Sequence, residues 1–357
     1  MSRIVRIQTA LFETPLHHPF VTSQGRSATA RGVAVLLTTD DGIEARGESV
    51  PAQYVTGETR ESVLQTVERI RPELIGIDVT RYRIAFETIA RLAPESPSAR
   101  CGLEMAVLHA WAQATQIGLW QLWGGATTTA ETDITIPIVP EAASLAMRAW
   151  QRGIRTFKIK VGSPDVEEDC ARVQDVLRAA PHARIRLDAN QAFTPENALR
   201  FVERLIVAGA QIELLEQPVA KEDLTGLHFV ATRSPVPVFA DESCRTPQEA
   251  LRLVTETGVH GFNCKINKSG IAGVLEILPI ARAAGRRLML GCMLETRYSI
   301  AVSLALACGT GAFEFIDLDS HLLLDEPGDN PCFHQQGATM RMRVPPAHNG
   351  AQQSALC

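Results

Sequence analysis

Five charged residues recur at nearly even intervals through the second half of the chain, each at the end of a short apolar run. Successive intervals of 28, 28, 25 and 24 residues separate Lys160, Asp188, Glu216, Asp241 and Lys265. Lysines and carboxylates can transfer protons or hold a cation when a fold brings them together. The spacing therefore predicts one shared site built from successive structural units.

The three acids in this series suggest a metal site. Asp188, Glu216 and Asp241 offer only oxygen ligands, with no His or Cys beside them. Oxygen-only sites suit hard cations, so we expect Mg²⁺, with Mn²⁺ as an alternative. Each acid alone could instead cap the next helix or pair with an arginine. Helix capping is disfavoured because Thr194 and Thr246 already stand at the predicted helix starts.

The lysines suggest proton transfer. Lys158 and Lys160 are two residues apart on one predicted strand, so their side chains share a face. Proximity of like charges would lower the pKa of one of them and make it a usable general base. Lys265 follows four strands later, across a barrel from this pair. Two lysines on opposite sides of a cation could remove a proton α to a carboxylate and return it to the other face. A surface position is the alternative, and we prefer it only for Lys268.

Alternating strand and helix patterns would position these residues. Apolar runs followed by amphipathic segments of helical length predict parallel strands with crossover helices. Seven or eight such units follow one another, and the sequence contains no G-x-G-x-x-G motif. Both observations favour a closed barrel over a doubly wound sheet. Pairs of a capping residue and proline predict helix starts at Ser163, Thr194 and Thr246. The predicted strands are residues 134–139, 156–161, 184–189, 211–217, 237–241, 261–266, 287–294 and 313–318.

The first third of the chain has a different pattern. Residues 3–12 and 32–39 alternate in period two around a predicted polar loop, 17–31, and a third strand and three helical patterns (61–71, 80–92 and 98–116) follow. Residues 127–132 are polar and predict a linker. We therefore expect an α+β domain over 1–126, a barrel carrying the active site over 127–321, and a tail, 322–357, that packs back on the first domain.

Composition excludes several classes of protein. The 357 residues are 45% hydrophobic with a mean hydropathy of +0.01, as in a protein with a large core, and no run has transmembrane length. The net charge of −5 gives no sign of nucleic-acid or membrane binding. The N-terminus lacks a signal-peptide apolar region, and eight cysteines without C-x-x-C pairs suggest free thiols. We expect a cytoplasmic homo-oligomer that acts on a small molecule.

The sequence resembles the muconate-lactonizing subgroup of the enolase superfamily. Five motifs carry the resemblance: Lys158-Ile-Lys160, Asp188-Ala-Asn190, Leu215-Glu216-Gln217-Pro218, Ala240-Asp241-Glu242-Ser243 and Asn263-Cys-Lys265. It implies a modified (β/α)7β barrel with an N-terminal α+β capping domain. It also implies Mg²⁺ on the three acids, Lys160 and Lys265 as the acid and base, and Lys158 at the substrate carboxylate.

Two further acids narrow the resemblance. Asp317 and Asp319 alternate on one face of the last predicted strand, where they could hold a substrate ammonium by charge-assisted hydrogen bonds. The pair resembles the D-x-D motif of dipeptide epimerases, and residues 55–59 and 291–296, including Glu295, are similar to that family too. These motifs imply a substrate-binding role for Glu295. A salt bridge from the acids to Arg297 or Lys158 is the structural alternative.

The resemblance implies that the enzyme inverts the C-terminal residue of a dipeptide by 1,1-proton transfer through an enediolate. The alternatives are o-succinylbenzoate synthase, muconate cycloisomerase and N-acylamino acid racemase, whose substrates lack the ammonium that Asp317 and Asp319 would bind. A non-catalytic barrel is disfavoured because no ligand or base is lost. Ala-Glu epimerases hold the substrate side chain with an arginine where this chain has Gly25. Arg26 follows it, and Arg297 is an alternative cation for the substrate.

Overall fold

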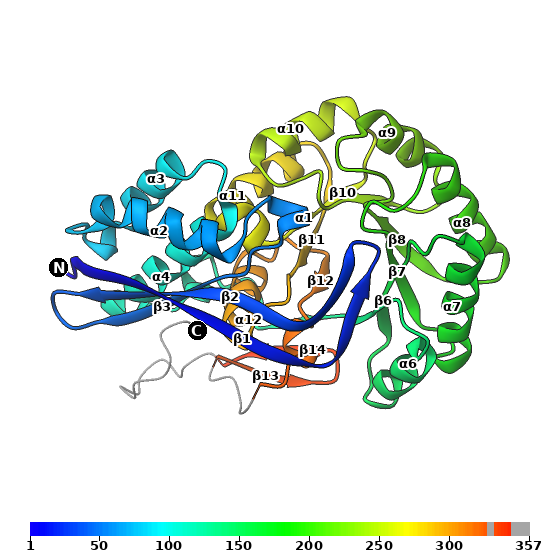
Figure 1. Ribbon diagram of the computed structural model, residues 1–357, viewed down its shortest axis with the longest axis horizontal. Helices are drawn as coiled ribbons and strands as arrows, with labels where there is room; N and C mark the ends of the chain where they lie inside the picture. The colour runs from blue at the N-terminus through cyan, green and yellow to red at the C-terminus, as the bar shows by residue number, and fades with distance from the viewer. Residues whose placement is uncertain (327–331, 344–357) are drawn as a thin grey trace.

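The computed structural model describes residues 1–326 and 332–343, which form an N-terminal α+β unit and an eight-stranded parallel sheet ringed by helices (Figure 1). This architecture confirms the predicted fold class. The N-terminal unit contains β1 (Ile4–Thr22), β2 (Gly25–Thr39), β3 (Glu44–Ser49), α1 (Gln53–Thr56), α2 (Arg60–Leu74), η1 (Val79–Arg81), α3 (Tyr82–Leu92), α4 (Pro97–Thr115) and α5 (Leu119–Leu122).

The first two strands are longer than predicted. β1 and β2 stay paired as far as Thr22 and Gly25, so segment 17–31 is a hairpin and the loop prediction was wrong. The hairpin tip reaches over the barrel strand ends (Figure 1), where Ser23 Oγ donates to Ala189 O at 3.0 Å and Gln24 Nε2 donates to Asn190 O at 2.6 Å. Much of this ribbon is exposed on both faces. No apolar alternation therefore marks it in the sequence.

The capping unit packs its sheet closely on α4. A side chain at Gly47 of β3 would lie 1.8 Å from Gly102 O of α4, and one at Gly102 would lie 2.2 Å from Ser49 Oγ. Only glycine at both positions allows this approach of strand and helix. The helices begin and end within about three residues of their predicted limits, because each carries a strong apolar periodicity.

The second unit is the barrel. Its strands are β5 (Ile134–Ile136), β6 (Thr156–Lys160), β7 (Arg184–Asp188), β8 (Ile212–Glu216), β9 (Val238–Ala240), β10 (Gly261–Cys264), β11 (Arg287–Gly291) and β12 (Phe315–Asp317), hydrogen-bonded in this order. Its helices are α6 (Ala142–Gln151), α7 (Val166–Ala179), α8 (Pro195–Val207), α9 (Leu224–Arg233), α10 (Pro247–Glu256), α11 (Ile266–Ala283) and α12 (Arg297–Thr310). The edge strands β5 and β12 are linked by isolated bonds, including Asp133 N to Ile316 O at 3.2 Å, and not by a ladder.

Local sequence explains most helix starts in the barrel. Thr194 and Thr246 accept hydrogen bonds from the backbone three residues on, with proline at the first helical position, as predicted. The prediction at Ser163 was wrong, since α7 begins at Val166 and Asp165 caps it. α8 follows β7, which ends at Asp188, and α10 follows β9, which ends just before Asp241, so each helix comes after a predicted site residue.

The segment after the barrel returns to the first unit. η2 (Ser320–Leu322) leads to an antiparallel bridge between Leu16 and Leu324, and β13 (Phe333–Gln336) and β14 (Thr339–Met342) form a sheet with β4 (Thr129–Glu131). Residues 127–132 are thus partly a strand and not only a linker. The predicted tail partly falls on residues 327–331 and 344–357, which lie outside the described residues. Within the described chain, we find no helix that is both long and apolar enough to span a membrane.

Candidate active site

The candidate site lies where the barrel strands end beneath the capping unit. A cavity of about 510 Å³ opens there between the β1–β2 hairpin, α1 and the strand ends. Tyr54 of α1 and Arg26 of the hairpin contribute from the capping unit. The predicted residues that line the cavity from the barrel are Lys158, Lys160, Asp241, Lys265, Asp317 and Asp319. The two units therefore build one site together.

Lys158 stands at the centre of the ionic contacts. Its Nζ lies 3.0 Å from Asp188 Oδ2, 2.9 Å from Glu216 Oε2 and 2.8 Å from Asp317 Oδ2. The side chain is buried, as are those of the three acids. Lys160, on the same face of β6, donates to Asp188 Oδ2 at 2.6 Å. The two lysines therefore share a carboxylate, as their spacing on one strand predicts.

The second predicted base lies across the barrel. Lys265 follows β10, four strands from β6 in the sheet order, and its Nζ donates to Asp241 Oδ2 at 2.8 Å. The prediction of a surface position for Lys268 was wrong. Its side chain is fully buried, and its Nζ donates to Asp241 Oδ1 at 2.5 Å and to Asn263 O at 2.6 Å. The helix starts directly after Lys265, and this turns Lys268 back into the barrel.

The acids and lysines shift one another's pKa values. Burial opposes ionisation of Lys158, but Asp188 and Asp317 outweigh it and raise the lysine pKa. Burial likewise disfavours the charged form of Lys265, and Asp241 raises its pKa in spite of this. The expected lowering by a neighbouring lysine is therefore not found at Lys158. Carboxylates, which outnumber the lysines here, dominate the local field.

The predicted metal ligands fit a cation by their chemistry. Asp188, Glu216 and Asp241 are at most 1% exposed, and the contact of Glu216 Oε2 with Lys158 Nζ at 2.9 Å is an ion pair without hydrogen-bond alignment. Burial and the charge of Asp188 raise the pKa of Glu216 to about 7, which marks an excess of negative charge. Lysine ammonium groups contact all three acids in this structure. The lysines thus supply positive charge to these buried carboxylate oxygens. Oxygen ligands of this kind are also those that a hard divalent ion prefers.

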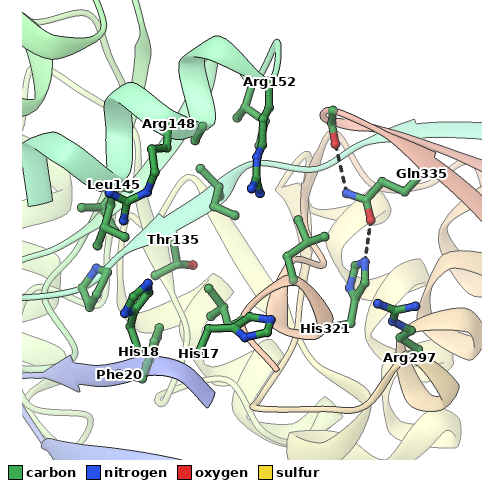
Figure 2. A pocket seen from close by; sticks show the side chains of 18 of the residues that line it. His17, His18, Phe20, Thr135, Leu145, Arg148, Arg152, Arg297, His321 and Gln335 are labelled. Carbon is green, nitrogen blue, oxygen red and sulfur yellow. Dashed lines mark hydrogen bonds between the residues drawn. The ribbon is translucent and has the colours of Figure 1, made fainter. Parts of the chain in front are cut away.

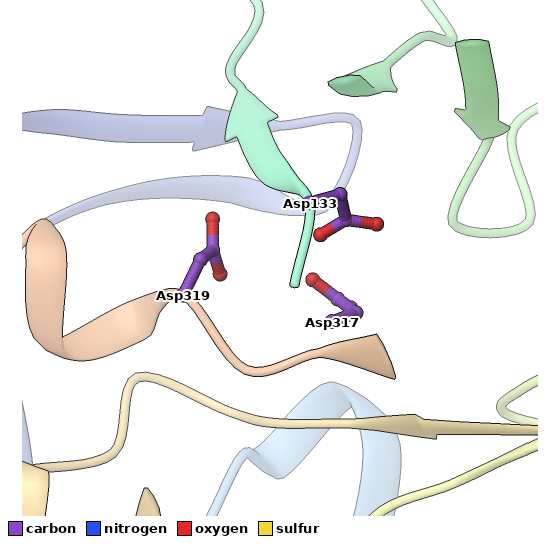
Figure 3. A group of neighbouring side chains, drawn as sticks. All are labelled: Asp133, Asp317 and Asp319. Atoms are coloured by element: carbon purple, nitrogen blue, oxygen red, sulfur yellow. The ribbon is translucent and has the colours of Figure 1, made fainter. Parts of the chain in front are cut away.

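A second acidic group lies beside the first. Asp133, Asp317 and Asp319 each place one carboxylate oxygen so that the three atoms lie within 4.8 Å of one another (Figure 3). In the described chain, the three predicted ligands do not gather this closely as a set. Arg186 Nη1 donates to Asp133 Oδ2 at 2.8 Å, while Asp133 Oδ1 has no partner there. The group is thus partly neutralised and keeps capacity for another cation.

Asp317 and Asp319 both line the cavity, but the prediction that strand alternation places them was wrong, because β12 ends at Asp317 and Asp319 lies at the start of η2. The salt bridge from Asp317 to Lys158, predicted as the structural alternative, is present. Asp319 Oδ2 accepts a hydrogen bond from Thr135 N at 2.6 Å. Burial, followed by the charge of Asp317, raises the pKa of Asp319 to about 6. A cation in the cavity would relieve this repulsion.

The remaining predicted residues are placed differently. Arg26 is exposed on the hairpin and lines the cavity. Glu295 is fully buried and does not line it, because its carboxylate accepts from Met293 N at 2.9 Å and from Ser299 Oγ. Arg297 faces another cavity and lies 3.8 Å from Glu326. This geometry favours structural roles for Glu295 and Arg297.

Sequence reasoning missed several residues of the site. Thr135 fixes Asp319 through its backbone, and Asn263 Nδ2 donates to Glu216 Oε1 at 2.7 Å. Tyr54 comes from the short helix α1, which carries no periodic signal. Asn263 is a polar residue in the otherwise apolar strand β10, a signal that could have identified its role.

A capped parallel barrel with lysines and acids at its strand ends defines an enzyme of the enolase superfamily. Residues 5–124 match the family model of the mandelate racemase / muconate lactonizing enzyme N-terminal domain, and residues 141–346 match that of the enolase C-terminal domain-like family. The chain belongs to the mandelate racemase / muconate lactonizing enzyme family.

Its relatives include dipeptide epimerases. The chain is 38% identical to the L-Ala-D/L-Glu epimerase of Thermotoga maritima, over 96% of this chain and 99% of that protein. It is 36% identical to the aromatic dipeptide epimerase of Herpetosiphon aurantiacus, over 95% of this chain and 96% of that protein. The substrate-liganded L-Ala-D/L-Glu epimerase of Bacillus subtilis superposes with a TM-score of 0.92. The two are 34% identical over 95% of this chain and 96% of that one. The Enterococcus faecalis dipeptide epimerase complexed with Mg and L-Leu-L-Tyr superposes with a TM-score of 0.91. The two are 30% identical over 99% of each chain.

Proposed function

We propose that this protein is a dipeptide epimerase that inverts the α-carbon of the C-terminal residue of a dipeptide. The observation that carries the proposal is the joining of two features in one cavity. Lys160 and Lys265 line it from strands on opposite sides of the barrel, and Asp317 and Asp319 line it as an acidic pair. The first feature serves proton transfer at a carbon acid, and the second serves an ammonium group.

The roles of the residues follow from their positions. Lys160 and Lys265 each remove the α-proton from one epimer and return it to the other face. Lys158 lines the same cavity, where it would contact the substrate carboxylate. Asp188, Glu216 and Asp241 would hold Mg²⁺, or Mn²⁺ in its place, and the cation would stabilise the enediolate. The positive charge of the cation would also offset the carboxylates that raise the pKa of Lys265. A lower lysine pKa is what a general base requires.

Two alternative chemistries use the same lysines. A lyase or cycloisomerase such as o-succinylbenzoate synthase or muconate cycloisomerase, and an N-acylamino acid racemase, act on carboxylates without a free ammonium. The acidic pair favours the dipeptide over these substrates, because Asp317 and Asp319 line the cavity and, within the described part of the chain, a lysine pairs with Asp317 but not with Asp319. The names of the relatives support the same choice.

Several finer assignments belong to the proposal. Arg26, exposed beside the cavity, would contact the side chain of the inverted residue. We propose the domain division at residues 126 and 321 as first predicted, a homo-oligomeric assembly and a cytoplasmic location. Relatives complexed with Mg and a dipeptide support Mg²⁺ as the cofactor.

The test is a dipeptide screen in D₂O with Mg²⁺. Purified protein is incubated with a library of L,L-dipeptides, and mass spectrometry measures a gain of one deuterium, while chiral chromatography identifies the epimer. Exchange with epimerisation at the C-terminal residue is the expected result. Turnover of N-acyl amino acids or of a succinylbenzoate precursor, with no exchange in any free dipeptide, would contradict the proposal.

A further inference from the structure

A second and larger cavity lies outside the candidate site. Its volume is about 1020 Å³, and it lies between α6, β5, η2 and β13, with β1 closing one end (Figure 2). This is the side of the barrel where β5 and β12 are not paired. The cavity shares a wall with the candidate site, formed by Phe20, Thr135 and Leu323. It is therefore adjacent to that site but has its own lining.

The lining of this cavity is cationic. Among the described residues, the lining includes arginines and histidines but no aspartate or glutamate. Arg148 on α6 and Arg152 at the C-cap of this helix extend toward the space between α6 and η2 (Figure 2). Neither side chain has an ion pair with a carboxylate of the described residues, whereas Arg297 lies 3.8 Å from Glu326. Two like charges at this spacing repel each other, and an anion between them would remove the repulsion.

The rest of the lining adds apolar surface and one hydrogen-bond acceptor. Phe20, Leu145 and Phe333 line the cavity, and His321 stacks edge-on against Phe333 with ring centroids 5.4 Å apart. His321 is 3% exposed and its Nε2 pairs with Gln335 Oε1 at 2.5 Å. Because Gln335 Nε2 donates to Gly337 O, its Oε1 accepts and His321 Nε2 carries the proton. His321 Nδ1 then offers a lone pair that has no donor among the described residues.

We propose that this cavity binds a small organic anion, separate from the dipeptide. Its charged head group would contact Arg148 and Arg152, its apolar body would pack on Phe20, Leu145 and Phe333, and a hydroxyl or amide N–H would reach His321 Nδ1. A cavity that is mainly apolar with a few convergent polar groups is typical of small-molecule sites. The proposal does not depend on the epimerase assignment, since none of these head-group contacts belongs to the candidate active site.

Octanoate is the probe, because it joins a carboxylate to an apolar chain. Isothermal titration calorimetry of the full-length protein with octanoate is compared with octyltrimethylammonium, which reverses the charge. We expect saturable binding of one octanoate and none of the cation. The Arg148→Gln/Arg152→Gln variant should bind octanoate at least about tenfold more weakly, since charge-assisted hydrogen bonds contribute this much or more.

Matched variants locate the binding. Arg200→Gln removes an exposed arginine on α8, far in sequence from the cavity lining, and should leave octanoate affinity within about twofold. Lys160→Ala tests whether octanoate instead enters the candidate active site. Loss of binding in Lys160→Ala with retention in the double arginine variant would overturn the proposal. Failure of wild-type protein to bind octanoate, or equal binding of the cation, would overturn it as well.

Discussion

Lys268 Nζ lies 2.5 Å from Asp241 Oδ1, and both side chains are buried inside the barrel. The other oxygen of this carboxylate accepts from Lys265 Nζ at 2.8 Å. Two ammonium groups thus hold Asp241, and they keep its pKa below the usual value although burial acts to raise it. Asp241 is therefore ionised and fixed in orientation. This suits both a metal ligand and a partner for a catalytic lysine.

We predict that Lys268→Met destabilises the protein strongly. The change removes the ammonium donor from Asp241 Oδ1 and from two backbone carbonyls, of which Asp241 O keeps a bond from Cys244 N. Breaking one side of a buried ion pair costs about 3–5 kcal/mol, and the free energy of unfolding in urea measures it. Lys221→Met, at a partly exposed lysine 4.0 Å from Glu222, is the control and should change stability by less than about 1 kcal/mol. Equal stability of both variants would contradict the structural role.

The sequence predicts the barrel and the positions of its strand ends well, for physical reasons that are local. Strands such as Val238–Ala240 are apolar runs followed directly by a charged residue, here Asp241, and Thr194 and Thr246 cap helices through bonds over three residues. The placement of Lys268 could not be predicted in this way. The direction of the Lys268 side chain depends on where α11 begins, which is one residue after Lys265. Strand and helix patterns overlap at this point of the sequence, so the start of the helix could not be located.

Contacts between distant segments also escaped sequence analysis. The hairpin docks on Ala189 O through Ser23, 166 residues away, and neither residue carries a signal of the contact. Glu295 resembled a substrate residue by its motif, yet its carboxylate is satisfied by Met293 N and Ser299. A motif identifies a residue and its neighbourhood. Whether its side chain faces the cavity depends on packing from elsewhere in the chain.

We predict that Glu216→Gln weakens Mg²⁺ binding and abolishes most turnover while the fold persists. Burial already raises the pKa of Glu216 to about 7, so a neutral isostere is tolerated in the apo protein. Affinity should fall by at least the roughly 10- to 100-fold that loss of a supporting residue costs. Calorimetric titration with Mg²⁺ measures this, with the exposed Glu222→Gln as control. Full activity of wild-type protein in excess EDTA, with no metal by elemental analysis, would disprove the metal site.

We predict that Lys160→Ala and Lys265→Ala each stop epimerisation. Each lysine serves one face of the substrate, so a single variant retains proton exchange with one epimer only. Loss of a general base should lower kcat about 10²- to 10⁴-fold. Proton NMR in D₂O, started separately from the L,L and L,D dipeptides, distinguishes the two losses, and Lys221→Ala is the control. Wild-type epimerisation by Lys265→Ala would refute the two-base mechanism.

We predict that His321 makes the protein less stable as the pH falls. Burial, with the charge of Arg297, lowers the pKa of His321 to about 4 from 6.5. Between these values the unfolded chain binds a proton that the folded protein does not, so the free energy of unfolding decreases toward acid pH. The contribution is about 2 kcal/mol between pH 7.5 and 5 at about 1.4 kcal/mol per pKa unit. Urea unfolding should show a smaller pH slope in His321→Gln and the wild-type slope in His228→Gln, whose histidine is exposed on α9.

The last prediction concerns the acidic pair at the end of β12. Asp317 and Asp319 line the cavity, and repulsion between them, added to burial, raises the pKa of Asp319 to about 6. A substrate ammonium would therefore be bound through charge-assisted hydrogen bonds worth about 1.5–3 kcal/mol. L,L-Dipeptides with a free N-terminus should be epimerised with kcat/KM roughly ten- to a hundredfold above their N-acetylated forms.

Asp319→Asn should remove most of this discrimination, because the amide keeps the shape and loses the charge. Its bond from Thr135 N can persist through the amide oxygen, so loss of folding does not explain the change. The measurement compares kcat/KM for Ala-Xaa and N-acetyl-Ala-Xaa pairs in wild type and variant. If wild-type protein turned over both members of a pair equally, Asp317 and Asp319 would not bind an ammonium. An N-acylamino acid racemase or lyase activity would then fit the lysines and acids of this barrel better.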